Sequence, residues 1–289
     1  MKTEPEKEHY ILTISCPDRT GIVAAVAGFL ASQDCFIRES SHFGDMETGR
    51  FFMRTVYLRG QKSPHQEALV KQFSKIAADF HMDWAIYDGC ARPKAVILVS
   101  RFDHCLNDLL YRYRTGALRM EIAAIASNQT ELSELAKWHR IAFHHFPVTA
   151  KTKSEQETKI LALIEESGAE LVILARYMQI LTPEFCEKLP GRIINIHHSF
   201  LPGFKGAKPY QQAHERGVKL IGATAHYVTP SLDEGPIIEQ EVERVDHSDT
   251  TETFVRSGRD IECLVLARAV RYHLERRVLL HGIKTVVFR

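Results

Sequence analysis

Residues 95–100 read AVILVS and are apolar up to the closing serine. This run predicts a buried strand, and helical spacing continues from it through residue 114. The same order of strand and helix then recurs, with a helical stretch over 153–167. The further strand candidates are residues 121–126, 141–146, 171–174 and 192–197. Such alternation predicts an α/β domain whose mostly parallel sheet is covered by helices on both faces.

The residues before this domain follow a different order. They predict strands over 10–15, 35–43, 51–58 and 82–87, and helices over 22–33 and 65–79. Asp18 or Thr20 can cap the first helix. The resulting βαββαβ order predicts a small α+β sandwich, and the stretch DGCARP at 88–93 is the expected joint. We therefore expect two domains, 1–88 and 89–289.

The chain ends with a strand over 223–228, a polar loop, and one long helix expected over 253–280.

Composition narrows the class of protein. The 289 residues suffice for two ordinary domains, and a net charge of +1 gives no general attraction to nucleic acid or acidic membranes. The longest apolar run, residues 22–31, is too short to span a bilayer, and no secretory signal is evident. Six scattered cysteines without a CxxC pair predict reduced thiols and a cytoplasmic protein with no metal site.

Residues 194–201, INIHHSFL, carry polar side chains at the end of an apolar strand. Asn195, His197 and Ser199 occupy alternate positions, so a strand would direct them to one side. Ligands of open parallel sheets bind outside the carboxyl ends of the strands. A second polar stretch, residues 222–240, carries Asp233 and Glu234 in the loop after a strand.

These residues suffice for acyl chemistry on nitrogen. Asn195 can donate to a carbonyl oxygen that becomes an oxyanion, and a protonated His197 can donate to the same oxygen or to the leaving nitrogen. Asp233 can take a proton from the attacking nucleophile. Each of these three residues, taken singly, also fits a structural role in a cap or turn. The hypothesis of acyl chemistry therefore depends on their combination.

The strings INIHHSFLPGFKGAKPYQQA and GATAHYVTPSLDEGPIIEQ resemble the folate-dependent formyltransferase superfamily. Its catalytic asparagine, histidine and aspartate match Asn195, His197 and Asp233 residue by residue. The resemblance implies a Rossmann-like formyltransferase fold for the second domain. It also implies a folate substrate and no further cofactor.

The variations within this superfamily point to one group. Glycinamide ribonucleotide transformylases resemble this chain but have a glycine-rich phosphate loop where residues 100–110 read SRFDHCLNDLL. Methionyl-tRNA formyltransferases carry an extra carboxyl-terminal domain. Here the extra domain comes first and resembles an ACT domain, the layout of the 10-formyltetrahydrofolate deformylases. HHFP at 144–147 and FKGAKPY at 204–210 also resemble that group.

This resemblance implies hydrolysis of 10-formyltetrahydrofolate to formate and tetrahydrofolate, supplying formate for purine synthesis and balancing one-carbon folate pools. One alternative is formyl transfer to an amine, by the same three residues. The other is a non-catalytic regulator that senses an amino acid.

The expected folate contacts carry over from the resemblance. They are Tyr177, Met178, Gln179, Ile180, Leu181, His198 and Glu234. Gln179 stands where the transformylases commonly have arginine. Core packing after a strand is an equally good explanation for the apolar members of the set.

ACT domains commonly pair and bind amino acids at their interfaces. The resemblance therefore makes Asp18, Arg19, Thr20 and Gly21 a possible effector site, and it implies a homo-oligomer. A capped turn that only supports pairing is the alternative, and self-association is the favoured reading.

Overall fold

A computed structural model describes residues 8–203 and 209–289. Contacts divide the chain into two compact units. The N-terminal unit is Met1–Ala91 with Glu275–Leu279 and Val286–Arg289, and the C-terminal unit is Arg92–Leu274 with Leu280–Thr285. The expected boundary at residue 88 does not account for Glu275–Leu279 and Val286–Arg289, which belong to the N-terminal unit.

Ion pairs and hydrogen bonds join the terminal segments to the N-terminal unit. The buried Arg54 donates from Nε to the carbonyl oxygen of Glu275, at 3.1 Å. Arg54 and Arg277 both contact Glu39 Oε1, at 2.7 and 3.2 Å. Glu39 therefore serves as a common acceptor for two guanidinium groups of this unit.

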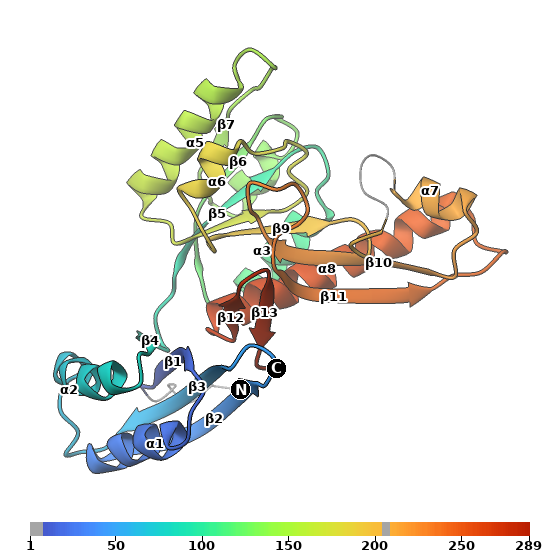
Figure 1. Cartoon of the computed structure of the whole chain (residues 1–289). Helices are drawn as coiled ribbons and strands as arrows, with labels where there is room; N and C mark the ends of the chain where they lie inside the picture. Colours follow the sequence, from blue (N-terminus) through green and yellow to red (C-terminus); the bar gives the residue numbers. More distant parts are fainter. Residues whose placement is uncertain (1–7, 204–208) are drawn as a thin grey trace. The chain divides into compact units, whose positions relative to one another are not determined.

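The N-terminal unit confirms the predicted βαββαβ order (Figure 1). Its elements are β1 (Tyr10–Pro17), α1 (Ile22–Ser32), β2 (Cys35–Asp45), β3 (Arg50–Arg59), α2 (Gln66–Asp79) and β4 (Asp83–Asp88). The antiparallel sheet has the order β2-β3-β1-β4. Its core joins buried residues of the strands with Phe29 of α1 and Phe73 of α2.

The first helix begins differently from the expectation. Gly21 occupies the N-cap position of α1 at φ 97°, and no side chain caps the helix. The capping role expected for Asp18 or Thr20 is therefore wrong. Glycine adopts this left-handed conformation without a steric penalty, so the chain turns sharply into the helix.

The C-terminal unit is built on a seven-stranded sheet with the order β11-β10-β9-β8-β5-β6-β7. Neighbours from β7 through β9 pair in parallel, while β10 and β11 run antiparallel at one edge. The strands are β5 (Lys94–Val99), β6 (Glu121–Ser127), β7 (Phe143–His145), β8 (Leu171–Leu174), β9 (Ile193–His197), β10 (Leu220–Tyr227) and β11 (Ile237–Arg244). The mostly parallel sheet is confirmed.

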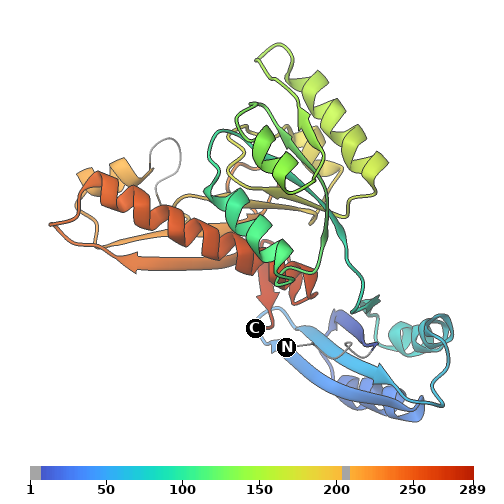
Figure 2. The same cartoon turned by 180° about the vertical axis from the view of Figure 1, so that it is seen from behind.

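Helices follow most of these strands. They are α3 (His104–Arg114), α4 (Ser133–Trp138), α5 (Lys153–Ser167), α6 (Pro183–Glu187), α7 (Pro209–Glu215) and α8 (Thr251–Leu274). Figure 2 shows α8 lying along β10 and β11, with which it is in contact. Within residues 8–203 and 209–289, no helix is both long and apolar enough to cross a membrane.

The long helix expected over 253–280 ends earlier. α8 stops at Leu274, and β12 (Val278–His281) and β13 (Lys284–Val287) form a two-stranded sheet instead. Arg276 lies at φ 54°, a left-handed conformation that an α-helix cannot continue through. Gly282 at φ 61° lies between the two strands.

Candidate active site

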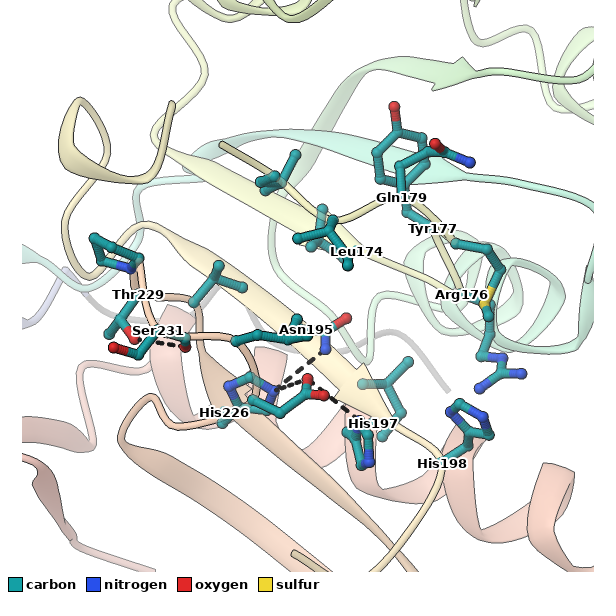
Figure 3. Close-up of a pocket in the computed structure, with 18 residues that line it drawn as sticks. Leu174, Arg176, Tyr177, Gln179, Asn195, His197, His198, His226, Thr229 and Ser231 are labelled. Carbon is teal, nitrogen blue, oxygen red and sulfur yellow. Dashed lines mark hydrogen bonds and ion pairs between the residues drawn. The ribbon is translucent and has the colours of Figure 1, made fainter. Parts of the chain in front are cut away.

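A cavity of about 390 Å³ lies beyond the carboxyl ends of β8 and β9. Figure 3 shows its lining side chains, with three dashed contacts around Asn195, His197 and His226 and a separate one between Thr229 and Ser231. The lining comes from the segment after β8, from β9 and its following residue, and from the end of β10 with the loop after it. This is the position at which open α/β sheets bind ligands.

Strand β9 places two of the predicted residues. Asn195 and His197 are two positions apart, so both side chains leave the same face of the strand and line the cavity. Ser199 was expected on the same side, but it does not line the cavity. Its hydroxyl donates to the carbonyl oxygen of Gly203 at 2.8 Å and closes the turn after the strand.

His226 is a cavity residue that the sequence reasoning missed. It lies in β10 directly opposite Asn195, and their side chains meet with Nδ2 of Asn195 3.2 Å from Nε2 of His226. Burial lowers the pKa of His226, which favours the neutral ring. Nδ1 lies 2.9 Å from the carbonyl oxygen of Tyr227, so Nδ1 carries the proton and Nε2 accepts from the amide of Asn195.

This contact sets the orientation of the Asn195 side chain. One amide hydrogen is used by His226, which assigns nitrogen rather than oxygen to that side of the group. The second amide hydrogen remains for another acceptor. The signal that points to His226 was its place near the end of the predicted strand 223–228, but the sequence did not give the pairing register.

Asp233 reaches the same place from the loop after β10. Its Oδ1 lies 3.3 Å from Nδ1 of His197 and 3.8 Å from Nε2 of His226. Asp233 adopts φ 56°, a conformation that aspartate tolerates better than most residues. Gly235 makes the close loop possible, because a Cβ there would lie 1.7 Å from the carbonyl oxygen of Tyr227.

The electrostatics of this group favour an ionised carboxylate. Burial alone would raise the pKa of Asp233, but the hydrogen bond from His197 and the nearby histidines outweigh it and hold the pKa below its usual value. On the other side of the His197 ring, Nε2 is buried and has no hydrogen bond among the described residues. A buried polar atom of this kind calls for a partner.

The five expected folate contacts at 177–181 all line the cavity, but in two ways. Tyr177 and Leu181 are buried in the core cluster on one side of the sheet. Met178 and Ile180 are 48% and 59% exposed, so they offer apolar surface to a ligand. Gln179 is partly exposed between them. Core packing therefore accounts for Tyr177 and Leu181, but it does not account for Met178 and Ile180.

His198 also lines the cavity, whereas Glu234 does not. Burial and the charge of Arg176 lower the pKa of His198 to about 4, so its ring is neutral near pH 7. Arg176 is a second lining residue that the sequence reasoning missed. It lies two residues after the end of β8 and adopts φ 64°, a conformation that sequence pattern does not reveal.

The other predicted positions lie elsewhere. Asp18, Arg19, Thr20 and Gly21 belong to the N-terminal unit. Arg19 stacks on the ring of Phe80 at 4.2 Å and donates to the carbonyl oxygen of Asp79. In the C-terminal unit, β7 holds His144 and His145 at the opposite edge of the sheet, and neither lines the cavity. Residues 204–208 of the FKGAKPY stretch lie outside the described residues.

One group of possible metal ligands exists within the described ranges: His104, Cys105 and Glu262, with ligand atoms within 4.8 Å. A hydrogen bond with Cys263 and burial raise the pKa of the Cys105 thiol, which disfavours the thiolate that metals require. The carboxylate of Glu262 already contacts His104 at 2.7 Å and Tyr210 at 2.9 Å. This group therefore does not support a metal site.

Comparisons with known proteins identify the family. Residues 93–270 match the formyl transferase family model. A formyltetrahydrofolate deformylase of Corynebacterium sp. (strain P-1) is 49% identical over 284 residues, covering 98% of this chain and 99% of the relative. The crystal structure of a formyltetrahydrofolate deformylase from Burkholderia mallei has a TM-score of 0.93 at 55% identity, covering 98% of this chain and all of the other.

A more distant structure marks the difference between the groups. Glycinamide ribonucleotide transformylase 1 from Symbiobacterium toebii has a TM-score of 0.65 at 29% identity, covering 68% of this chain and 95% of the other. The match to the deformylases, in contrast, extends over both units. The chain therefore belongs to the formyltetrahydrofolate deformylase family.

Proposed function

We propose that this protein hydrolyses 10-formyltetrahydrofolate to formate and tetrahydrofolate. The observation that carries the proposal is the arrangement of Asn195, His197 and Asp233 around one cavity, in a chain that matches deformylases along nearly its whole length. The exposed apolar side chains of Met178 and Ile180 offer a surface for the flat pterin ring. The polar groups then face the formyl carbon.

Asp233 acts as the base in this proposal. Its carboxylate is ionised near pH 7 and can accept a proton from water, while the water oxygen forms a bond to the formyl carbon. The carbonyl oxygen becomes an oxyanion. The second amide hydrogen of Asn195 and the Nε2 hydrogen of a protonated His197 donate to that oxygen.

Collapse of this tetrahedral intermediate breaks the bond between the formyl carbon and N10. N10 takes its proton from His197 or from a water molecule that relays it. The proton on Asp233 then returns to His197 across the 3.3 Å contact, and the acid proton of the product passes to solvent. The products are formate and tetrahydrofolate, and the side chains return to their starting state.

The direct test is an assay of purified protein with 10-formyltetrahydrofolate and no amine. We expect equal amounts of formate and tetrahydrofolate. Formate release that depends strictly on an added amine would establish a transferase instead. Folate binding without turnover under any condition would favour a regulatory protein.

The roles proposed for the N-terminal unit are self-association and effector binding, in a cytoplasmic protein. Its βαββαβ fold and resemblance to ACT domains support self-association as the primary role. Asp18, Arg19, Thr20 and Gly21 are the proposed effector contacts. Light scattering of the purified protein tests the first role, and a change in turnover on adding single amino acids tests the second. A monomer at all concentrations would contradict self-association.

A further inference from the structure

A second cavity of about 420 Å³ lies next to the first. Both cavities are lined by Arg176, Met178 and His198, so they adjoin at His198, the residue after His197. The second cavity also includes Phe102 and His104, from the stretch 100–110 that replaces a glycine-rich loop. The proposed function does not use this space.

A buried glutamate on α8 organises one wall. Glu262 is 1% exposed and receives hydrogen bonds from Tyr210, at 2.9 Å, and His104, at 2.7 Å. Burial would raise the pKa of Glu262, but His104, Arg176 and Tyr210 outweigh it, and the group remains a carboxylate. Its oxygens are therefore already engaged, and it presents little free acceptor capacity to a ligand.

The position of Tyr210, on α7, depends on Gly258, which lies on α8 one turn before Glu262. A Cβ at Gly258 would lie 2.1 Å from Cζ of Tyr210, so only glycine leaves room for that ring. The hydroxyl then reaches Glu262. The packing thus fixes the carboxylate in its bonded position.

The cations of the cavity are less fully engaged. The buried Nε of Arg176 lies 3.4 Å from Oε2 of Glu262 as an ion pair, and it makes no hydrogen bond within the described residues. Arg259 stacks on the ring of Phe102 at 5.9 Å and has no carboxylate partner in the part of the chain that the structure describes. Two guanidinium groups thus face one carboxylate, which leaves a net positive charge.

We infer that this second cavity binds the formate product, with Arg259 and Arg176 as its cationic contacts. The inference rests on the proposed function, since that reaction generates a small carboxylate beside His198. Guanidinium groups bind carboxylates through two parallel hydrogen bonds. In the proposed function the folate occupies the first cavity, so formate can leave through the second cavity without displacing tetrahydrofolate.

The test uses ¹³C-labelled sodium formate and the resting full-length protein, with binding read from the broadening of the formate NMR signal. Wild type is expected to bind formate saturably. Arg259→Gln is expected to weaken binding about tenfold through the loss of a charge-assisted contact, and Arg259→Lys is expected to lie between the two. Arg256→Gln is the matched control, because Arg256 is exposed on the same helix and does not line the cavity.

Product inhibition provides a second measurement. The inhibition constant for formate should rise about tenfold in Arg259→Gln, whereas that for tetrahydrofolate should not change. Absence of saturable formate binding to wild type would overturn the inference, as would equal binding by wild type and Arg259→Gln. An equal loss of formate affinity in Arg256→Gln would also overturn the inference, since the loss of any positive charge on this helix would then explain the effect.

Inorganic phosphate distinguishes formate from other anions. Phosphate that displaces formate at equal concentration would show a general anion site and overturn the assignment. Failure of the proposed function is a separate result. It would appear as no formate release from 10-formyltetrahydrofolate, whereas the NMR experiment measures binding without turnover.

Discussion

Replacing Asp233 with asparagine tests the central contact of the site. Asparagine has the same shape and also tolerates the left-handed conformation found there, so the loop is expected to keep its course. The change removes the negative charge 3.3 Å from Nδ1 of His197. It also removes the proposed acceptor of the water proton.

The distance sets the magnitude. Two unit charges 3.3 Å apart interact by about 5 kcal/mol at an effective dielectric constant of ~20, and by about 1.3 kcal/mol in bulk water. Asp233 is 13% exposed, so its environment lies between these limits. Since each 1.36 kcal/mol corresponds to a factor of ~10 in rate, charge loss alone costs between roughly tenfold and several thousandfold. We expect kcat to fall by roughly 10²–10³.

The assay is steady-state formation of tetrahydrofolate, with thermal unfolding as a check of the fold. The matched control is Asp260→Asn, the same chemical change at an exposed position of α8. Turnover of Asp233→Asn within about threefold of wild type from pH 6 to 9, with Asp260→Asn also unchanged, would refute Asp233 as the base.

Three further predictions concern other contacts. His226→Gln should lower kcat by roughly tenfold by releasing the Asn195 amide, and little further loss is expected when Asn195 is also replaced. His198→Gln should make the free energy of unfolding less sensitive to acid. Between the unfolded pKa near 6.5 and the folded pKa of about 4, the unfolded wild-type chain binds more protons than the folded chain. Wild type should therefore lose about 2 kcal/mol more unfolding free energy than His198→Gln on going from pH 7.5 to 5. Phe73→Ala should cost about 3–5 kcal/mol of unfolding free energy, because Phe73 is fully buried against Phe29 and Trp84.

Each of these has a direct control. Additive losses from the His226 and Asn195 replacements would contradict the positioning role. Equal pH dependence of denaturant unfolding in wild type and His198→Gln would contradict the neutral buried ring. For the core, Phe36→Ala removes a side chain that is 67% exposed, so a comparable loss there would contradict the packing argument.

The apolar runs and their spacing were enough to predict both folds. Residues 95–100 have no polar side chain before the closing serine, which is typical of a strand covered on both faces, and β5 is buried almost throughout. The βαββαβ order followed in the same way from strand and helix periodicity. These features depend on neighbours in the chain, so a single sequence carries them.

The sequence by itself also determined that Asn195 and His197 leave one face of a strand, because that follows from the two-residue repeat. Only the tertiary structure decided that His226 holds Asn195, since their meeting depends on the register between β9 and β10. It likewise decided that Arg176 and Glu262 face each other from distant parts of the chain. Such contacts are set by long-range packing and backbone conformation, and no local pattern encodes them.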